Sequence, residues 1–364
     1  MSITRTPTED PKADQWRLLS QYAYPTNIRR YLSGSGRAES DKSVEEYVAG
    51  CVRQGEAYFT AADRAPLDIT PLLLYYGSSN LLAGASAMLT GVVPVVNNHG
   101  MRLKVPDAEG PRIADVRVLP FDPGAGALQS FSDVFSEGCP LASQGDWTVE
   151  EILGSVPDLK RDFENCYQGA APFTIPVQPA QRTFRYSDED GTERRVIYER
   201  VDPEDVKRFE NPVDAIRSVR HFSAAYLFPQ AGDDLTHIVL YRKWKANEIG
   251  FYSIYGRKYL EVPHVKKGQS LSPAQLIIMY MGLFALGYVS RYHPELWNPF
   301  VRSDTTGERL VIEKYLSLCQ RYVPNLVLNA ISNTRIEFVH PAGAGFTRDD
   351  AAGQGLRLEH GSHA

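Results

Sequence analysis

The feature that most constrains the fold is an apolar stretch late in the chain. Residues 276–289 contain no charged side chain, and Ser272 and Pro273 precede them as a suitable N-cap and first-turn pair for a helix. The stretch is shorter than the roughly 20 residues that span a bilayer, and Arg291 and His293 follow closely. The sequence therefore predicts a buried core helix rather than a membrane span.

A second apolar stretch, at residues 69–89, is rich in Leu and Ala. Small residues interrupt it at several positions, namely Gly77, Ser78, Ser79, Gly84 and Ala85. Small side chains let another helix, or a ligand, approach the backbone closely. We therefore predict that residues 69–89 form the central buried helix.

Composition narrows the class of protein. Of the 364 residues, 43% are hydrophobic and 23% charged, which is ordinary for a soluble globular chain. A net charge of -5 gives no general attraction to nucleic acid or anionic membranes. The four cysteines lie far apart without a metal-binding spacing, and residues 1–14 are polar and lack a signal peptide's apolar segment. A cytoplasmic protein with reduced thiols is expected, and no cofactor is identified.

The middle of the chain has a β-like pattern. Residues 182–186 and 194–198 alternate in period two around an acidic, glycine-containing turn, which predicts a β-hairpin. Residues 237–244 and 250–255 are expected to form a further strand pair.

These patterns predict an α+β fold in which N- and C-terminal helices pack together and a β-rich segment is inserted between them. We expect a single globular domain over residues 13–342, flanked by disordered ends. Its expected parts are a disordered N-terminus at 1–12, helices at 13–91 and 272–340, the β-rich insertion at 92–265, and a disordered tail at 343–364.

One group of residues has the chemistry of an anion site. Tyr76 and Asn80 share one helix face, and Arg291 and His293 lie where the late apolar helix ends. Arginine, histidine and amide groups that converge can hold a phosphate or carboxylate, while tyrosine stacks on a base. The alternative is a polar network that caps helix ends. The candidate ligand-binding residues are Tyr75, Tyr76, Asn80, His99, Arg102, Arg291 and His293.

A second pair, Arg335 and His340, has the spacing of the Arg-x4-His element of HEPN-type ribonucleases. On a late helix, such a pair would act on an RNA 2′-hydroxyl and the scissile phosphate. Ile336 replaces the polar residue usual there, and Pro341 indicates a helix end, so the match departs from the pattern. Residues 242–245 (RKWK) interleave an aromatic ring with cations, as single-stranded nucleic acid, including RNA, would favour; the alternative is a solvated charged face.

Three segments resemble those of the YaaC-like proteins of bacteria: LYYGSSNL at 74–81, NHG at 98–100 and SRYHPELW at 290–297. The resemblance covers roughly residues 15–340 and implies a cytoplasmic bacterial protein. It transfers no catalytic residue, because the family has no agreed activity.

Three hypotheses follow. The leading one is a regulatory or enzymatic protein that binds an anionic small molecule such as a nucleotide. The second is a HEPN-like ribonuclease or nucleotide-acting enzyme in a toxin or phage-defence setting, with Arg335 and His340 as its catalytic pair. The third is a structural protein-interaction module.

Overall fold

The computed structural model describes residues 2–34, 41–107, 110–121, 126–136, 139, 141–168, 174–187, 193–201, 227–228, 238–243, 251–254, 257–261 and 273–341. Its α-helices are α1 (Pro11–Ser20), α2 (Pro25–Gly34), α3 (Lys42–Ala62), α4 (Thr70–Thr90), α5 (Ala127–Phe135), α6 (Val149–Gly154), α7 (Lys160–Cys166), α10 (Gln275–Tyr292), α11 (Pro294–Ser303) and α12 (Glu308–Ser332). Short 3-10 turns are η1 (Gln21–Ala23), η2 (Ile113–Asp115), η3 (Leu141–Gln144) and η4 (Pro157–Leu159).

The strands are β1 (Ser2–Pro7), β2 (Met101–Lys104), β3 (Arg117–Pro120), β4 (Trp147–Thr148), β5 (Thr174–Ser187), β6 (Glu193–Val201), β7 (Leu227–Phe228), β8 (Ile238–Lys243), β9 (Phe251–Tyr252), β10 (Lys258–Glu261) and β11 (Thr334–Val339). They pair in the orders β1-β11, β2-β3-β4 and β7-β8-β6-β5-β10-β9. The β1–β11 pair is parallel, and the other described pairs are antiparallel. The predicted α+β class is confirmed.

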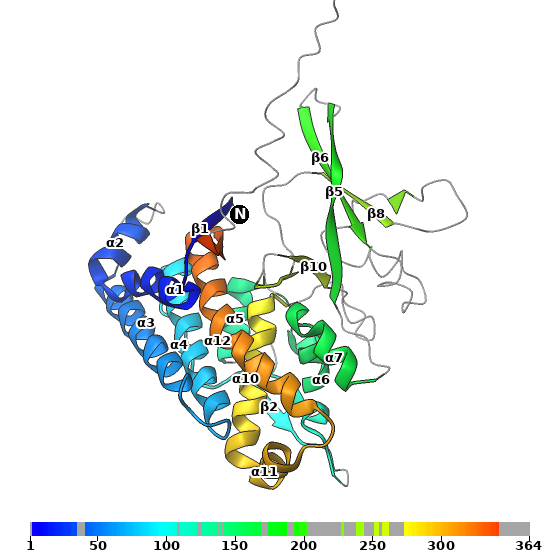
Figure 1. The fold of residues 1–364 in the computed structure, drawn as a ribbon. Helices are drawn as coiled ribbons and strands as arrows, with labels where there is room; N and C mark the ends of the chain where they lie inside the picture. Colours follow the sequence, from blue (N-terminus) through cyan, green and yellow to red (C-terminus); the bar gives the residue numbers. More distant parts are fainter. Residues whose placement is uncertain are drawn as a thin grey trace, which may run out of the picture.

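The two predicted apolar helices, α4 and α10, lie side by side at the centre of the molecule (Figure 1). They run antiparallel, because Gly287 near the end of α10 meets Leu72 near the start of α4, whereas Tyr280 meets Ser79. Almost every residue of α10 is buried, which is expected of a helix that is apolar all round. Each fully buried Leu, Ile or Phe side chain contributes about 1.5–3 kcal/mol.

Glycines set the spacing between α3 and α4. A Cβ atom added to Gly77 of α4 would lie 2.7 Å from Phe59, and one on Gly84 would lie 2.8 Å from the Cβ of Cys51. On the α3 side, a Cβ on Gly55 would lie 2.8 Å from Leu81. The predicted role of the small residues of α4, close approach of another helix, is therefore confirmed at this interface.

The N- and C-terminal helices pack together, as predicted. Arg321 of α12 donates a 2.7 Å hydrogen bond to the amide oxygen of Gln15 in α1. The Tyr31 hydroxyl of α2 donates to the Ile331 carbonyl at 2.8 Å. Pro324 lies inside α12 without ending it. These contacts join the first and last thirds of the chain into one helical body.

The predicted β-hairpin is confirmed, with Thr183 opposite Ile197 and Tyr186 opposite Arg194 in the β5–β6 register. Figure 1 shows β5 and β6 extending away from the helices. The further strand pair was wrongly matched: β8 pairs with β6 and β7, whereas β9 pairs with β10. The predicted β-rich insertion also contains α5, α6 and α7, since residues 127–166 include helical segments with buried apolar faces.

Two predictions at the chain ends need correction. Residues 2–7 were expected to be disordered but form β1, whose backbone pairs with β11. The helical segment expected up to residue 340 ends at Ser332, because Asn333 adopts a left-handed conformation with φ of 47° that caps α12. Residues 334–339 then continue as β11. The predicted disordered tail, 343–364, lies outside the described residues.

Candidate functional site

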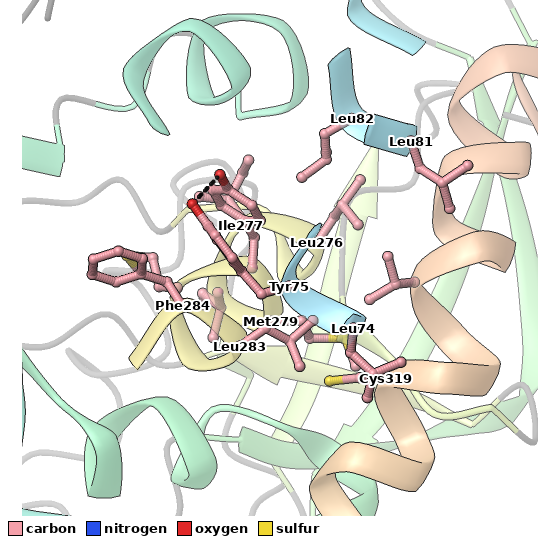
Figure 2. Packing of buried hydrophobic residues seen from close by; sticks show 14 of the residues in the cluster. Leu74, Tyr75, Leu81, Leu82, Leu276, Ile277, Met279, Leu283, Phe284 and Cys319 are labelled. Carbon is pink, nitrogen blue, oxygen red and sulfur yellow. Dashed lines mark hydrogen bonds between the residues drawn. The ribbon is translucent and has the colours of Figure 1, made fainter. Parts of the chain in front are cut away.

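The contact between Tyr75 and His99 is the best-defined part of the candidate site. Tyr75 is 4% exposed in α4, and its hydroxyl lies 2.7 Å from Nδ1 of His99. His99 itself is exposed to solvent. Both residues also contact the ring of Phe284, each with a centroid distance of 5.6 Å. Figure 2 shows Tyr75 lying among Leu283 and Phe284 of α10, with a dashed line marking its hydrogen bond to a second tyrosine.

The backbone around His99 is fixed by α5. The amides of Ala127 and Leu128, at the start of that helix, donate to the carbonyls of Asn98 and His99. The Asn98 side chain accepts from the Gly100 amide at 2.8 Å. Gly126 has a positive φ of 86°, and a Cβ there would lie 2.0 Å from the Asn98 side-chain oxygen. Only glycine fits at this position, and the two backbone hydrogen bonds from α5 hold the segment that carries the imidazole.

A chain of hydroxyl groups leads from His99 into the core. The Tyr75 hydroxyl lies 3.1 Å from that of Tyr280, which in turn lies 3.1 Å from Ser79 Oγ. The Tyr75 and Tyr280 rings stack with centroids 5.3 Å apart. Buried hydroxyl groups need such partners, since an unpaired one loses its hydrogen bonds to water.

Desolvation affects the protonation of both tyrosine hydroxyls and, in part, of His99. Desolvation raises the pKa of the hydroxyls of Tyr75 and Tyr280, so both stay protonated. Desolvation also lowers the pKa of His99, which favours the neutral imidazole. The chain is therefore uncharged at neutral pH, and its donors and acceptors can be matched one to one.

The second contact joins Arg291 to Tyr76. Arg291 lies exposed in the last turn of α10 and donates a hydrogen bond of 3.3 Å to the Tyr76 hydroxyl. Its guanidinium also lies 4.9 Å from the ring centroid of Tyr292. Asn80 is engaged within α4, because its amide donates to the Tyr76 carbonyl at 2.9 Å. Four of the predicted residues thus fall into two contacts on consecutive tyrosines, and Asn80 supports the second.

The other two predicted residues are not part of these contacts. His293 caps the start of α11 and pairs through Nδ1 with Glu295 at 2.9 Å, which matches the alternative of a helix-end network. Ring contacts through Tyr288 nevertheless connect His293 to Phe284, the ring that touches His99. Arg102 is exposed on β2. Within the described residues, no hydrogen bond or ion pair joins Arg102 to this group.

Sequence reasoning missed Tyr280 and Ser79 as members of the site. Both lie in stretches that were read only as apolar helix. A tyrosine inside an otherwise apolar helix is a usable signal, because its hydroxyl needs a buried partner. The partner itself could not be read, since it lies on a helix about 200 residues earlier.

The Arg335–His340 pair does not lie on a helix, which contradicts the premise of the ribonuclease hypothesis. Arg335 is on β11, where it pairs with Glu337 and lies 3.8 Å from the ring centroid of Tyr252. His340 follows the strand. Alternating apolar residues, Ile336 and Phe338, are the strand signal that the spacing argument overlooked.

A further cluster surrounds Tyr252 at the foot of the large sheet. Gln275 of α10 makes two hydrogen bonds to the Tyr252 backbone, at 3.2 and 3.1 Å, and the Tyr322 hydroxyl donates to its carbonyl. Asp158 accepts from the Ile254 amide at 3.1 Å, and burial raises the pKa of its carboxyl group to about 6. These groups are engaged in holding residues 251–254 against the helices.

Glu308 is a buried carboxylate with a structural task. It accepts hydrogen bonds from the amides of Ile113 and Ala114, at 3.2 and 2.8 Å, and from the Tyr167 hydroxyl at 3.0 Å. Burial raises its pKa, while these donors act in the opposite direction. With its acceptor sites engaged in this way, Glu308 anchors the start of α12 to η2.

The described part of the chain contains neither a membrane-spanning helix nor a cluster of metal-ligating side chains. No helix there is long and apolar enough to cross a membrane. Among the same residues, no group of three His, Cys, Asp or Glu side chains is placed to hold a metal ion. The two tyrosine contacts therefore remain the best-organised candidate site.

Comparison with known proteins gives the family. No curated protein and no solved structure matches the chain significantly. The family model described as YaaC-like Protein matches residues 13–331, which include α4, α10 and both tyrosine contacts. The chain therefore belongs to the YaaC-like protein family.

Proposed function

We propose that this protein binds an anionic small molecule such as a nucleotide in the cytoplasm, where His99 contacts Tyr75 and Arg291 contacts Tyr76. The observation that carries the proposal is the pair of hydrogen bonds that hold an imidazole and a guanidinium on two consecutive tyrosines. Rigid placement of donors before a ligand arrives reduces the ordering cost of binding.

The charge of Arg291 supports an anionic ligand. Among the described residues Arg291 donates a hydrogen bond only to Tyr76, which leaves further N–H groups of the planar fork for phosphate or carboxylate oxygens. Across the described residues, no carboxylate forms an ion pair with Arg291. An exposed guanidinium that is braced by tyrosines, yet not neutralised, is suited to an external anion.

Aromatic surface supports a nucleotide in particular. Tyr292 is 53% exposed beside Arg291, and Tyr76 is half-buried against Tyr58 and Tyr75. An exposed tyrosine ring offers a stacking partner for a base, while the arginine takes the phosphate.

The first experiment is mass spectrometry of the material released when freshly purified protein is denatured. Thermal unfolding is then measured with AMP, ADP and inorganic phosphate as probes. Binding at 100 times Kd would stabilise the protein by about 2.7 kcal/mol. Arg291→Ala should abolish this stabilisation, while Arg302→Ala, at an exposed arginine of α11, should retain it. Unchanged stabilisation in Arg291→Ala would overturn the proposal.

The ribonuclease hypothesis, whose helical premise is contradicted by strand β11, has its own test. It predicts RNA cleavage that His340→Ala eliminates, and equal cleavage by parent and variant would remove Arg335 and His340 as the catalytic pair. An interaction module would instead show no stabilisation by any of the three probes and a stable complex with a protein partner.

A further inference from the structure

The hydroxyl chain behind His99 has only two consistent arrangements of its protons. Tyr280 lies between Ser79 and Tyr75, and Tyr75 lies between Tyr280 and His99. Each hydroxyl has one proton to donate. If no buried hydroxyl proton is left without an acceptor, the hydrogen bonds run either all toward His99 or all away from it.

The identity of the terminal pair decides the direction. A phenol with an ordinary pKa of about 10 is a much stronger acid than the N–H of a neutral imidazole, and the bare imidazole nitrogen is a good acceptor. The O–H···N arrangement is therefore favoured over N–H···O at the 2.7 Å contact between Tyr75 and His99. Partial desolvation lowers the pKa of His99 and favours the neutral imidazole, whose one bare nitrogen can then accept the hydrogen bond from Tyr75.

We propose that Tyr75 fixes His99 in the tautomer that carries its proton on Nε2, so that the exposed edge of the ring is a neutral hydrogen-bond donor. The hydrogen bond at one ring nitrogen determines the state of the other. Nε2 has no hydrogen-bond partner among the described residues, and the backbone clamp on residues 98–100 holds the ring in place. Tyr75 is a positioning residue that acts through His99.

The ligand class follows from this assignment, which here rests on the proposed function. A neutral N–H donor accepts no proton from a ligand and needs no acidic pH to bind an oxyanion. His99 and Arg291 would therefore both donate to acceptor oxygens, as in a phosphate or carboxylate. The site thus favours a ligand that is already ionised over one that must be deprotonated there.

The tautomer can be read directly by NMR. In protein labelled with 15N-histidine, two-bond 1H–15N correlations at neutral pH distinguish Nε2–H, Nδ1–H and imidazolium rings. His99→Gln assigns the relevant signals among the 8 histidines. The parent should show the Nε2–H pattern. Tyr75→Phe should move His99 toward a mixture of tautomers, and Tyr76→Phe, which removes the partner of Arg291 instead, should leave it unchanged.

Three results would overturn the assignment: an Nδ1–H pattern in the parent, an imidazolium ring at neutral pH, or an unchanged pattern in folded Tyr75→Phe. If Tyr75→Phe does not fold, the parent spectrum alone still decides the tautomer. The measurement needs no ligand, so it stands apart from the test of the proposed function.

The donor role is tested with the probe that stabilises the parent, chosen from AMP, ADP and phosphate. His99→Ala should weaken binding about tenfold, as expected for one hydrogen bond to a charged group. His99→Gln, whose amide keeps an N–H donor, should recover part of that loss. If the parent shows an Nε2–H ring but His99→Ala binds the probe with full affinity, the tautomer assignment stands and the donor role is refuted.

Discussion

The two faces of α4 are built on opposite principles. Toward α3, glycines bring the backbones so close that no Cβ fits at Gly77 or Gly84. Toward α10, tyrosine rings fill the space, and their hydroxyls form the chain from Ser79 to His99. One side of α4 is thus closely packed against α3, which we call the sealed side. The other side carries a chain of hydrogen-bonded hydroxyls that ends at the exposed His99.

The difference shows how the helix combines stability with a site. The close-packed α3 side depends on shape and tolerates no added volume. The α10 side depends on matched hydrogen bonds, since a buried hydroxyl without a partner is costly. A rigid first face holds the second in register, so the polar chain can end at a defined position of His99.

The largest effect should come from adding volume to the sealed side. In Gly84→Ala the new methyl group would lie 2.8 Å from the Cβ of Cys51, an atom close to the backbone that cannot swing away. We expect a loss of about 1–3 kcal/mol in unfolding free energy, measured by urea denaturation. Gly50→Ala on α3, where a Cβ meets nothing within 4 Å, should instead gain up to about 1 kcal/mol. Equal effects would contradict the sealed-face interpretation.

A smaller effect should come from breaking the polar chain. Tyr280→Phe keeps the ring but removes the hydroxyl that lies between Ser79 and Tyr75. Each of these two hydroxyls then loses one hydrogen-bond partner. The expected cost is about 1–2 kcal/mol, again from urea denaturation. Tyr288→Phe, a half-buried tyrosine of the same helix, serves as the control and should change stability by less than about 0.5 kcal/mol. If Tyr280→Phe and this control changed stability equally, the hydrogen bonds of the Tyr280 hydroxyl would make no net contribution to the free energy of unfolding.

The smallest effect concerns pH. Because burial lowers the folded-state pKa of His99, the unfolded chain binds the proton first as the pH falls. The contribution of His99 to stability is therefore complete above the unfolded pKa of about 6.5 and is lost progressively below it. Tyr75, which faces His99, stays protonated throughout because its pKa is raised.

The measurement compares parent and His99→Gln between about pH 7.5 and about pH 5.5. The parent should lose more unfolding free energy over this window. Asp158, whose folded pKa is raised to about 6, acts in the opposite direction, since its protonation restores stability at low pH. Both proteins share Asp158, so it cancels in the difference. Identical pH profiles of the parent and His99→Gln would show that the titration of His99 does not contribute to the pH dependence of stability.

The sequence predictions that were confirmed rested on hydrophobic patterns within short stretches of the chain. The two apolar stretches became α4 and α10, and period-two alternation located the β5–β6 hairpin. These elements can be predicted because the residues that follow one another along the chain show the hydrophobic periodicity of a buried helix or strand. The two candidate contacts could be predicted only in part. The sequence indicated the residue types, but the pairing of Tyr75 with His99 and of Tyr76 with Arg291 depends on how the helices pack together.

The failures were elements whose partner is distant in sequence. Residues 2–7 have a polar composition and look disordered alone, and β11 was read as the end of a helix. Each strand is stabilised by the other, so neither has a decisive local signal. Similarly, β8 and β9 are near in sequence yet pair with different strands, because sheet order is decided by tertiary packing.

The pairing of β1 with β11 also has a consequence for biosynthesis. Arg5 bonds to Glu337, which lies 332 residues later. At about 5–20 residues per second, a ribosome needs roughly 20–70 s to make that length of chain. During this interval the N-terminal segment has no strand partner, whereas α3 and α4 are adjacent in sequence and can associate early. Closure of this small parallel sheet therefore has to wait until β11 has been synthesised and has left the ribosome.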